Sequence, residues 1–160
     1  MFRFLVIACC LATPAFGYSS GAPKEVCTNG LTPEHHVAPQ TSAVPYFFST
    51  DASVKAGDKL TVKLGGDEFL GFAIQVQDAN KKPIGSFKVV ESNKSQTLTC
   101  SKADDTLTHV KIDKKNIPNS LQFQWIAPAD YKGKAKLVGT VAKNGATYWI
   151  GKVLKEIEVQ

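Results

Sequence analysis

Apolar and polar residues alternate in short segments along most of the chain after residue 57. A period of two places alternate side chains on opposite faces of a strand, so each segment predicts a β-strand with one buried face. In residues 121–125 the alternation puts Leu121, Phe123 and Trp125 on one face. The other predicted strands are residues 59–64, 72–77, 84–89, 97–100, 109–113, 136–141, 147–153 and 155–159.

Turn signals separate these segments. A polar turn at residues 78–83 predicts a hairpin between the strands that flank it, and Asn144-Gly145 predicts a second. About eight or nine short strands, with no helical period outside the N-terminus, indicate an all-β antiparallel sandwich or barrel with one face of each sheet in water. The residues expected to fill the space between the sheets are Leu60, Val62, Leu64, Phe72, Ile74, Val76, Leu121, Phe123, Trp125, Val141 and Trp149.

Residues 18–56 lack this alternation and are rich in turn residues. Five prolines or glycines, from Pro23 to Pro45, interrupt any long helix or central strand. We therefore expect an extended N-terminal segment that wraps the domain, with an edge strand near residues 46–48.

The first 17 residues have the pattern of a secretory signal peptide. Arg3 precedes nine apolar residues, 4–12, and Ala15-Phe16-Gly17 supplies small residues for cleavage before Tyr18. The alternative, a membrane anchor, needs about 20 apolar residues. We expect residues 18–160 to form a single domain, and no later stretch is apolar and long enough to cross a membrane.

Two cysteines remain after the predicted cleavage, Cys27 and Cys100. In an oxidising compartment they most simply form one disulfide, the alternatives being free thiols or a link between chains. The chain after residue 17 holds 18 lysines, 14 acidic residues and no arginine, a net charge of +4. Because base recognition relies on arginine, this composition argues against nucleic-acid binding and leaves attraction to anionic glycans or lipid phosphates.

No set of residues predicts catalysis or a metal site. There is no Gly-x-Ser-x-Gly motif, and His35, His36 and His109 are too few and too dispersed to predict a zinc site. The acidic pairs Asp67-Glu68 and Asp104-Asp105 lie in polar segments and are interpreted as solvated turn residues. His109 is interpreted as a structural residue, and we expect no enzyme, cofactor or metal.

Two surface features predict chemistry. Asn93-Lys94-Ser95 is an N-glycosylation sequon in a polar segment. Lysines cluster in three groups, and the third, at period two, would share one strand face as a positive stripe for an anionic ligand or as protection of an edge strand. The three groups are Lys81 with Lys82, Lys114 with Lys115, and Lys132 with Lys134 and Lys136.

An ordered set of short motifs resembles the reeler domain. The set comprises Cys27, Gly71-Phe72, Pro83-Ile84-Gly85-Ser86-Phe87, Cys100, Thr108-His109, Phe123-Gln124-Trp125-Ile126-Ala127-Pro128 and Tyr148-Trp149. It spans residues 24–155 and is most similar to single-domain insect defence proteins of the noduler type. The resemblance implies an immunoglobulin-like β-sandwich with a Cys27–Cys100 disulfide.

The same resemblance implies a secreted innate-immunity protein of the haemolymph. Its partners would be lipopolysaccharide, lipoteichoic acid or β-glucan on microbial surfaces, together with haemocytes. The alternative is an extracellular-matrix or cell-surface module that binds host glycans. Killing by membrane disruption fits less well, because no cationic amphipathic helix is visible.

Overall fold

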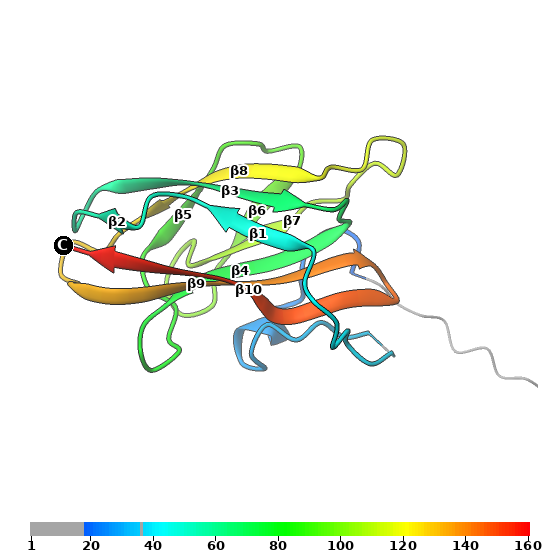
Figure 1. Ribbon diagram of the computed structural model, residues 1–160, viewed down its shortest axis with the longest axis horizontal. Helices are drawn as coiled ribbons and strands as arrows, with labels where there is room; N and C mark the ends of the chain where they lie inside the picture. The colour runs from blue at the N-terminus through cyan, green and yellow to red at the C-terminus, as the bar shows by residue number, and fades with distance from the viewer. Residues whose placement is uncertain (1–17, 36) are drawn as a thin grey trace, which may run out of the picture.

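The computed structural model describes residues 18–35 and 37–160, so the predicted signal peptide and His36 lie outside the described residues. Two β-sheets face each other, with strand orders β1-β3-β8-β5 and β2-β10-β9-β4-β7-β6 (Figure 1). The strands are β1 (Tyr46–Ser49), β2 (Ser53–Val54), β3 (Lys59–Gly66), β4 (Gly71–Gln77), β5 (Ser86–Val89), β6 (Ser95–Leu98), β7 (Thr106–His109), β8 (Ser120–Ile126), β9 (Gly133–Asn144) and β10 (Thr147–Val159). The predicted all-β sandwich is confirmed, with one short 3₁₀ helix, η1 (Lys24–Cys27), in the described part of the chain.

The core lies between the two sheets, as the alternation predicted. All eleven residues expected there are buried, and Val62, Phe123 and Trp125 are fully inaccessible to solvent. Phe123 contacts Phe48 and Phe87 edge to face, with ring centroids 6.4 and 5.7 Å away. Burial of this one apolar layer is the main force that holds the sheets together.

The predicted hairpin between residues 72–77 and 84–89 is wrong. The turn forms, and Ile84 N donates to Val76 O, but β5 then crosses to the other sheet and pairs with β8. The crossing occurs at Gly85, where φ is +70° and an added Cβ would lie 2.4 Å from Ile126 O and 2.5 Å from Trp125 Nε1. Only glycine combines this backbone conformation with such close packing.

Several strand boundaries also differ from the predictions. β7 ends at His109 instead of beginning there, and β6 ends before Cys100. The segments 147–153 and 155–159 form one strand, β10, which stays paired with β9 on both sides of an irregularity between Trp149 and Val153. Glycine at position 151, with φ +56°, takes up the irregularity.

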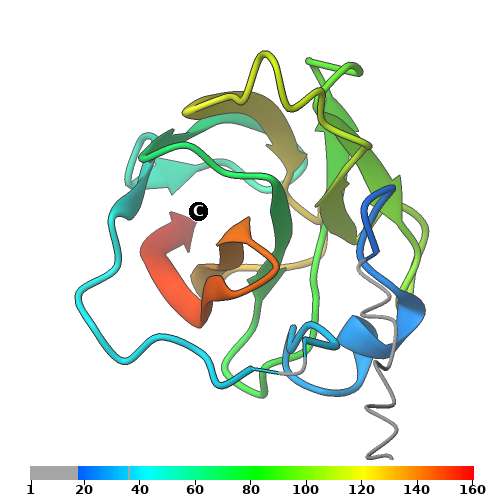
Figure 2. The ribbon, with the colours of Figure 1, turned by 90° about the vertical axis from the view of Figure 1, so that its right-hand side faces the viewer.

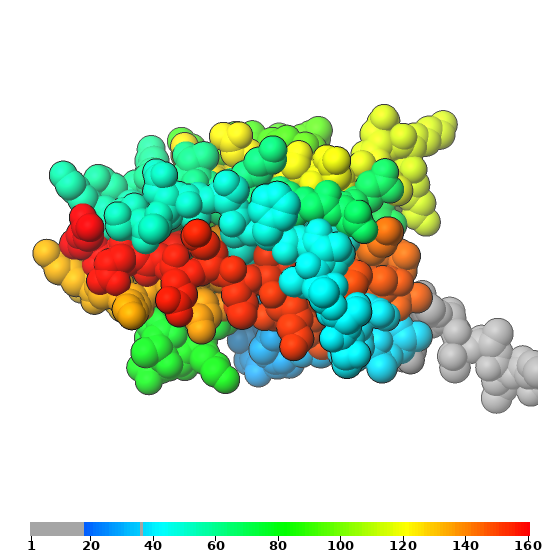
Figure 3. Space-filling model, in the orientation of Figure 1, coloured from blue at the N-terminus to red at the C-terminus, as the bar shows by residue number. Residues whose placement is uncertain are grey.

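Residues 18–35 and 37–45, which we call the strap, run along the outside of the six-stranded sheet. Seen from one end, the strap passes around the molecule from blue to cyan (Figure 2). Its later part crosses β10 in the space-filling view (Figure 3). Val26 and Leu31 of the strap pack on Ala73 of β4 and form a second, smaller core on the outer face of the sheet. The expected wrapping segment and the edge strand β1 are therefore present.

Candidate functional site

The strap is attached to the sheet at two places. On the β6–β7 side, Cys27 and Cys100 form a disulfide with a Cα–Cα distance of 5.2 Å. Ala22 N donates to Thr108 Oγ1 at 2.8 Å. The disulfide predicted from the sequence is thus present, and it ties the strap to the loop after β6.

The second attachment is on β10. Gln40 N donates to Tyr148 O at 2.8 Å, and the Tyr148 hydroxyl donates to Val37 O. Trp149 Nε1 donates to Ser42 O at 3.3 Å. The His35 ring packs on Tyr148 with the ring centroids 4.8 Å apart. Between the two attachments, Leu31 packs on the sheet at Ala73, and this contact borders a cavity.

A cavity of about 280 Å³ lies between the strap and the outer face of the sheet. Its floor is made of small residues of β4 and β9, including Gly71, Ala73 and Ala142. Its walls are mostly apolar and come from the strap and from the segments before β4 and after β7, namely Ala22, Pro23, Val26, Leu31, Pro33, Leu70 and Ile112. This partly open, mostly apolar cavity is the most distinct candidate binding site of the described chain.

The polar groups inside the cavity are already bonded to protein atoms. His109 Nε2 lies 3.0 Å from Tyr18 O, and Phe72 N donates to His109 Nδ1 at 3.2 Å. A carbonyl can only accept, so a proton on Nε2 suits the contact with Tyr18 O, while Nδ1 lies near both Phe72 N and Phe72 O. Thr140 Oγ1 accepts from Gly151 N at 2.9 Å. The interpretation of His109 as a structural residue fits this bonding.

One cation lines the rim. Lys114 is exposed on the loop between β7 and β8 and has no ion pair among the described residues. The rim also holds Glu34, whose carboxylate accepts from the Tyr18 hydroxyl at 3.2 Å. The Tyr18 pKa is raised by that hydrogen bond and by the negative charge of Glu34. The phenol therefore stays a neutral donor at physiological pH.

The structure separates the three predicted lysine groups. Lys81 and Lys82 lie in the turn after β4, and Lys132 precedes β9. Because Gln77 of β4 pairs with Lys136 of β9, these two groups share one end of the six-stranded sheet. Lys114 and Lys115 lie at the opposite end, after β7, so the seven lysines do not form one surface.

The predicted positive stripe on β9 has carboxylates beside it. In the antiparallel register Lys134 is opposite Glu158 and Lys136 is opposite Glu156. Directly opposed side chains of unlike charge attract each other across strands. The net positive potential at this end is therefore expected from Lys81, Lys82 and Lys132 more than from the strand lysines.

Asn93 is exposed in the turn between β5 and β6. The neighbouring sequon residue Ser95 is buried, and its hydroxyl donates to Glu91 O at 3.1 Å. An exposed asparagine leaves room for a glycan on the folded protein. Glycosylation itself stays a prediction.

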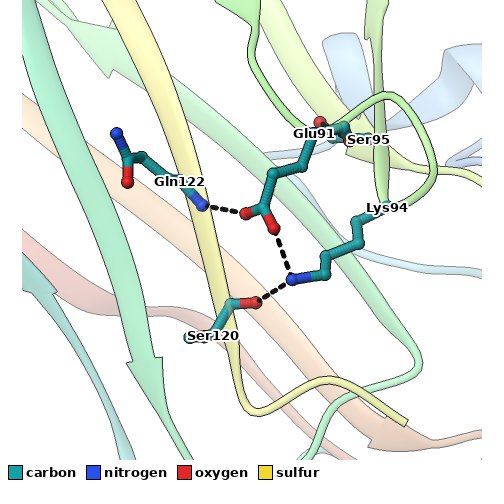
Figure 4. Close-up of polar contacts among 5 residues, drawn as sticks. All are labelled: Glu91, Lys94, Ser95, Ser120 and Gln122. Atoms are coloured by element: carbon teal, nitrogen blue, oxygen red, sulfur yellow. Dashed lines mark hydrogen bonds and ion pairs between the residues drawn. The ribbon is translucent and has the colours of Figure 1, made fainter. Parts of the chain in front are cut away.

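The same turn completes the edge of β8 beyond the end of β5. Glu91 Oε2 accepts from Gln122 N at 2.6 Å, while Lys94 Nζ donates to Ser120 O at 3.2 Å (Figure 4). Glu91 and Lys94 also form an ion pair at 2.5 Å. Burial alone would raise the pKa of Glu91, but the hydrogen bonds from Lys94 and Gln122 N and the charges of Lys94 and Lys63 leave it below its ordinary value.

The interpretation of Asp105 as a solvated turn residue is wrong, although its neighbour Asp104 is exposed as expected. The Asp105 carboxylate is fully buried and accepts from the backbone N–H groups of Cys100, Ser101 and Lys102. Burial by itself would raise the Asp105 pKa, and these hydrogen bonds outweigh it and lower the pKa. Asp105 thus fixes the loop that carries the disulfide.

A second hollow, of about 480 Å³, lies where β5 begins. It is more open than the first cavity, and its lining includes Lys102, Asp130 and Tyr131. With charges of both signs and little enclosure, it offers less to a specific ligand than the cavity under the strap.

The sequence did not reveal the cavity. The small residues of its floor lie on two different strands. Ala142 of β9 is 71 positions from Gly71 and 69 positions from Ala73 of β4, and only the pairing of Gly71 with Ala142 brings them together. A weak signal existed in the alternation of β4, where small or polar residues face outward between Phe72, Ile74 and Val76.

No group of three or more possible metal ligands occurs among the residues that the structure describes. In the same part of the chain no helix is long and apolar enough to cross a membrane.

Comparison with known proteins identifies the family. The sequence profile of the Reeler domain matches residues 25–160. The chain is 48% identical over 160 residues to "Defense protein l(2)34Fc" of Drosophila melanogaster, covering 100% of both chains. It is 30% identical over 150 residues to ferric-chelate reductase 1 of Mus musculus, covering 91% of this chain and 24% of that longer protein.

Among solved structures, the Reelin-N domain of F-spondin superimposes with a TM-score of 0.63 at 16% identity, covering 78% of this chain and 92% of the other. This likeness concerns the fold and agrees with the expected immunoglobulin-like sandwich. Since the family profile extends over nearly the whole described chain and the fold agrees, the chain belongs to the reeler-domain family.

Proposed function

We propose that this chain is a secreted, non-enzymatic defence protein that binds phosphate-bearing polymers of microbial surfaces, such as lipopolysaccharide or lipoteichoic acid. The observation that carries the proposal is the 48% identity, over the whole length, to a protein named as a defence protein. The sequon and the N-terminal pattern of residues 1–17 support an extracellular location.

The charge distribution suggests where such a polymer binds. Lys81, Lys82 and Lys132 are exposed, form no ion pair among the described residues and share one end of the six-stranded sheet. Ammonium groups without a carboxylate partner can pair with phosphates without first breaking an existing contact. We call these three residues the turn lysines.

The experiment is a binding assay with the purified mature protein. Its retention is measured on bacteria, on yeast, on purified lipopolysaccharide and lipoteichoic acid, and on β-glucan as an uncharged comparison. We expect stronger binding to the phosphate-bearing polymers, and weaker binding as salt shortens the electrostatic range to about 8 Å at 0.15 M. Absence of binding to every microbial ligand at low and high salt contradicts the proposal, and retention on heparin alone favours the host-glycan alternative.

Matched variants test the location. Reversing the charge of the three turn lysines to glutamate changes the net charge by −6, and so does reversal of Lys88, Lys111 and Lys152, which are exposed elsewhere. We expect the first triple variant to lose most lipopolysaccharide binding and the second to retain it. Equal losses would show that net charge, and not this end of the sheet, is responsible.

A further inference from the structure

We propose that the cavity beneath the strap binds a single medium-chain amphiphile, with an alkyl chain of about ten carbons inside and an anionic head group at Lys114. This site is separate from the turn lysines, and the inference holds or fails independently of the function proposed above.

The volume sets the size of the ligand. An apolar cavity of roughly 150 Å³ accommodates benzene, which has six carbons. At about 280 Å³, the cavity under the strap has nearly twice that volume. By this proportion about ten or eleven carbons fit inside, and the rest of a longer chain would protrude through the open side of the cavity.

The lining sets the chemistry of the enclosed part. Most of the wall is aliphatic, and no buried side-chain nitrogen or oxygen in the described chain lacks a hydrogen-bond partner. His109 and Thr140 face the cavity but are committed to Tyr18, Phe72 and Gly151. The polar groups of a ligand would find no free hydrogen-bond partner deep in the cavity. The part of the ligand that lies inside should therefore be hydrocarbon.

The rim sets the head group. Lys114 has no ion pair in the described chain, whereas the rim carboxylate of Glu34 already accepts from the Tyr18 hydroxyl. Cleavage at the predicted site would add a second cation there, because Tyr18 lines the cavity and would then carry the terminal ammonium. Glu34 keeps its negative charge, so Lys114 and the new terminal ammonium together would leave the rim with one net positive charge. A carboxylate or phosphate head therefore suits the rim better than a cationic one.

The fold also explains why the cavity does not collapse. The strap is fixed on one side by the Cys27–Cys100 disulfide and on the other by Tyr148. On the floor, the ring of His109 lies over Gly71, where an added Cβ would be 3.3 Å from His109 Cε1. These covalent and hydrogen-bonded contacts fix the two ends of the strap, while the packing of Val26 and Leu31 on Ala73 borders the cavity between them.

Isothermal titration calorimetry on the secreted, disulfide-bonded protein tests the inference with saturated fatty acids from hexanoate to hexadecanoate below their micellar concentrations. We expect one site per chain and an affinity that rises about tenfold for each two methylene groups, levelling off near ten to twelve carbons. Decanoate should bind more tightly than decanol, and decanol more tightly than decylammonium. No saturable binding of any member, or an affinity that continues to rise to hexadecanoate, would overturn the proposal.

Two pairs of variants locate the ligand. Ala142→Leu fills the floor and should abolish decanoate binding, while Ala146→Leu, in the adjacent turn outside the cavity, should not. Lys114→Glu should weaken decanoate about threefold at 0.15 M salt and leave decanol unchanged, as expected for an exposed ion pair. Lys115→Glu carries the same charge change beside the rim and should have no such effect. If both members of a pair behave alike, the cavity is not the site.

The hydrocarbon could come from a free fatty acid or from the acyl chain of a larger lipid. Titration with phosphatidylglycerol vesicles distinguishes the two, because a chain anchored in a bilayer must leave it to enter the cavity. Binding of decanoate without binding of vesicles supports the proposed free amphiphile. Binding of vesicles by the wild type that Ala142→Leu abolishes would show that acyl chains of membrane lipids occupy the cavity, and would overturn the proposal of a free medium-chain ligand. Lipopolysaccharide binding that survives Ala142→Leu leaves the turn lysines as the polymer site.

Discussion

Replacing Asp105 by asparagine should destabilise the domain strongly, although the change preserves the shape of the side chain. The carboxylate is fully buried. Its Oδ2 accepts from Ser101 N, Ser101 Oγ and Lys102 N at 2.7 to 2.8 Å, and its Oδ1 accepts from Cys100 N at 2.8 Å. Asparagine has one oxygen, which can serve only one of these two sets of donors.

The magnitude follows from that count. With the amide oxygen in the Oδ2 position, the amide nitrogen faces the Cys100 N–H, which is left without an acceptor at a cost of about 1–3 kcal/mol. The remaining hydrogen bonds become neutral and lose about half of their strength. We expect a total loss of about 2–4 kcal/mol. For a domain of about 140 residues this corresponds to a fall in Tm of roughly 7–13 °C.

Urea unfolding of the wild type and of Asp105→Asn measures this difference, with Asp104→Asn as the control. Asp104 is exposed and has φ +58°, a conformation that asparagine tolerates, so the control should differ from wild type by less than about 0.5 kcal/mol.

The effect should also depend on pH. The folded-state pKa of Asp105 is lowered, so its contribution to stability is complete above the unfolded pKa of about 3.9 and is lost as pH falls through the folded value. The stability gap between wild type and Asp105→Asn should therefore be constant from pH 5 to 7 and narrow below about pH 4. A loss under 0.5 kcal/mol, or a gap unchanged at pH 3, would refute the reasoning.

Three further predictions concern the strap and the β5–β6 turn. Replacing both Cys27 and Cys100 by serine should cost about 4 kcal/mol, because the disulfide closes a loop with a sequence separation of 73; a loss below 1 kcal/mol in urea unfolding would contradict this. Glu91→Gln should cost about 1 kcal/mol at pH 7 through the weakened bond to Gln122 N. Since the Glu91 pKa is lowered, that cost should fade below about pH 4, and a cost independent of pH would argue against it. Asn93→Gln should abolish the mobility shift caused by N-glycosidase in protein secreted from insect cells, whereas persistence of the shift would exclude Asn93 as the glycan site.

Strand positions and the inner core could be predicted because they depend on local alternation. Leu121, Phe123 and Trp125 had to share a face whatever their partners were, and that face is buried. The pairing partner of a strand could not be predicted in the same way. The turn at residues 78–83 is compatible with a hairpin or with a crossing to the other sheet. Gly85, packed against Trp125, decided for the crossing, and this contact involves residues 40 positions apart.

Some features of the candidate sites could also be predicted from the sequence, and others could not. The disulfide and the exposure of Asn93 followed from residue type and compartment. The separation of the lysine groups, the glutamates opposite Lys134 and Lys136, and the burial of Asp105 did not, because each depends on which segments become neighbours. A carboxylate in a polar segment has the same sequence signature whether it is solvated or holds three backbone N–H groups.

By itself, the sequence determined an all-β sandwich, its inner core, a strap joined by one disulfide, and membership of a family whose motifs mark that scaffold. Only the tertiary structure decided that the strap leaves a cavity of about 280 Å³ against the outer face of β4 and β9, bordered by the contact of Val26 and Leu31 with Ala73. The physical reason is that the period-two pattern records which side of a strand is buried. It does not record what covers the other side, and here that depends on attachments at Cys100 and Tyr148, far from the strap in sequence.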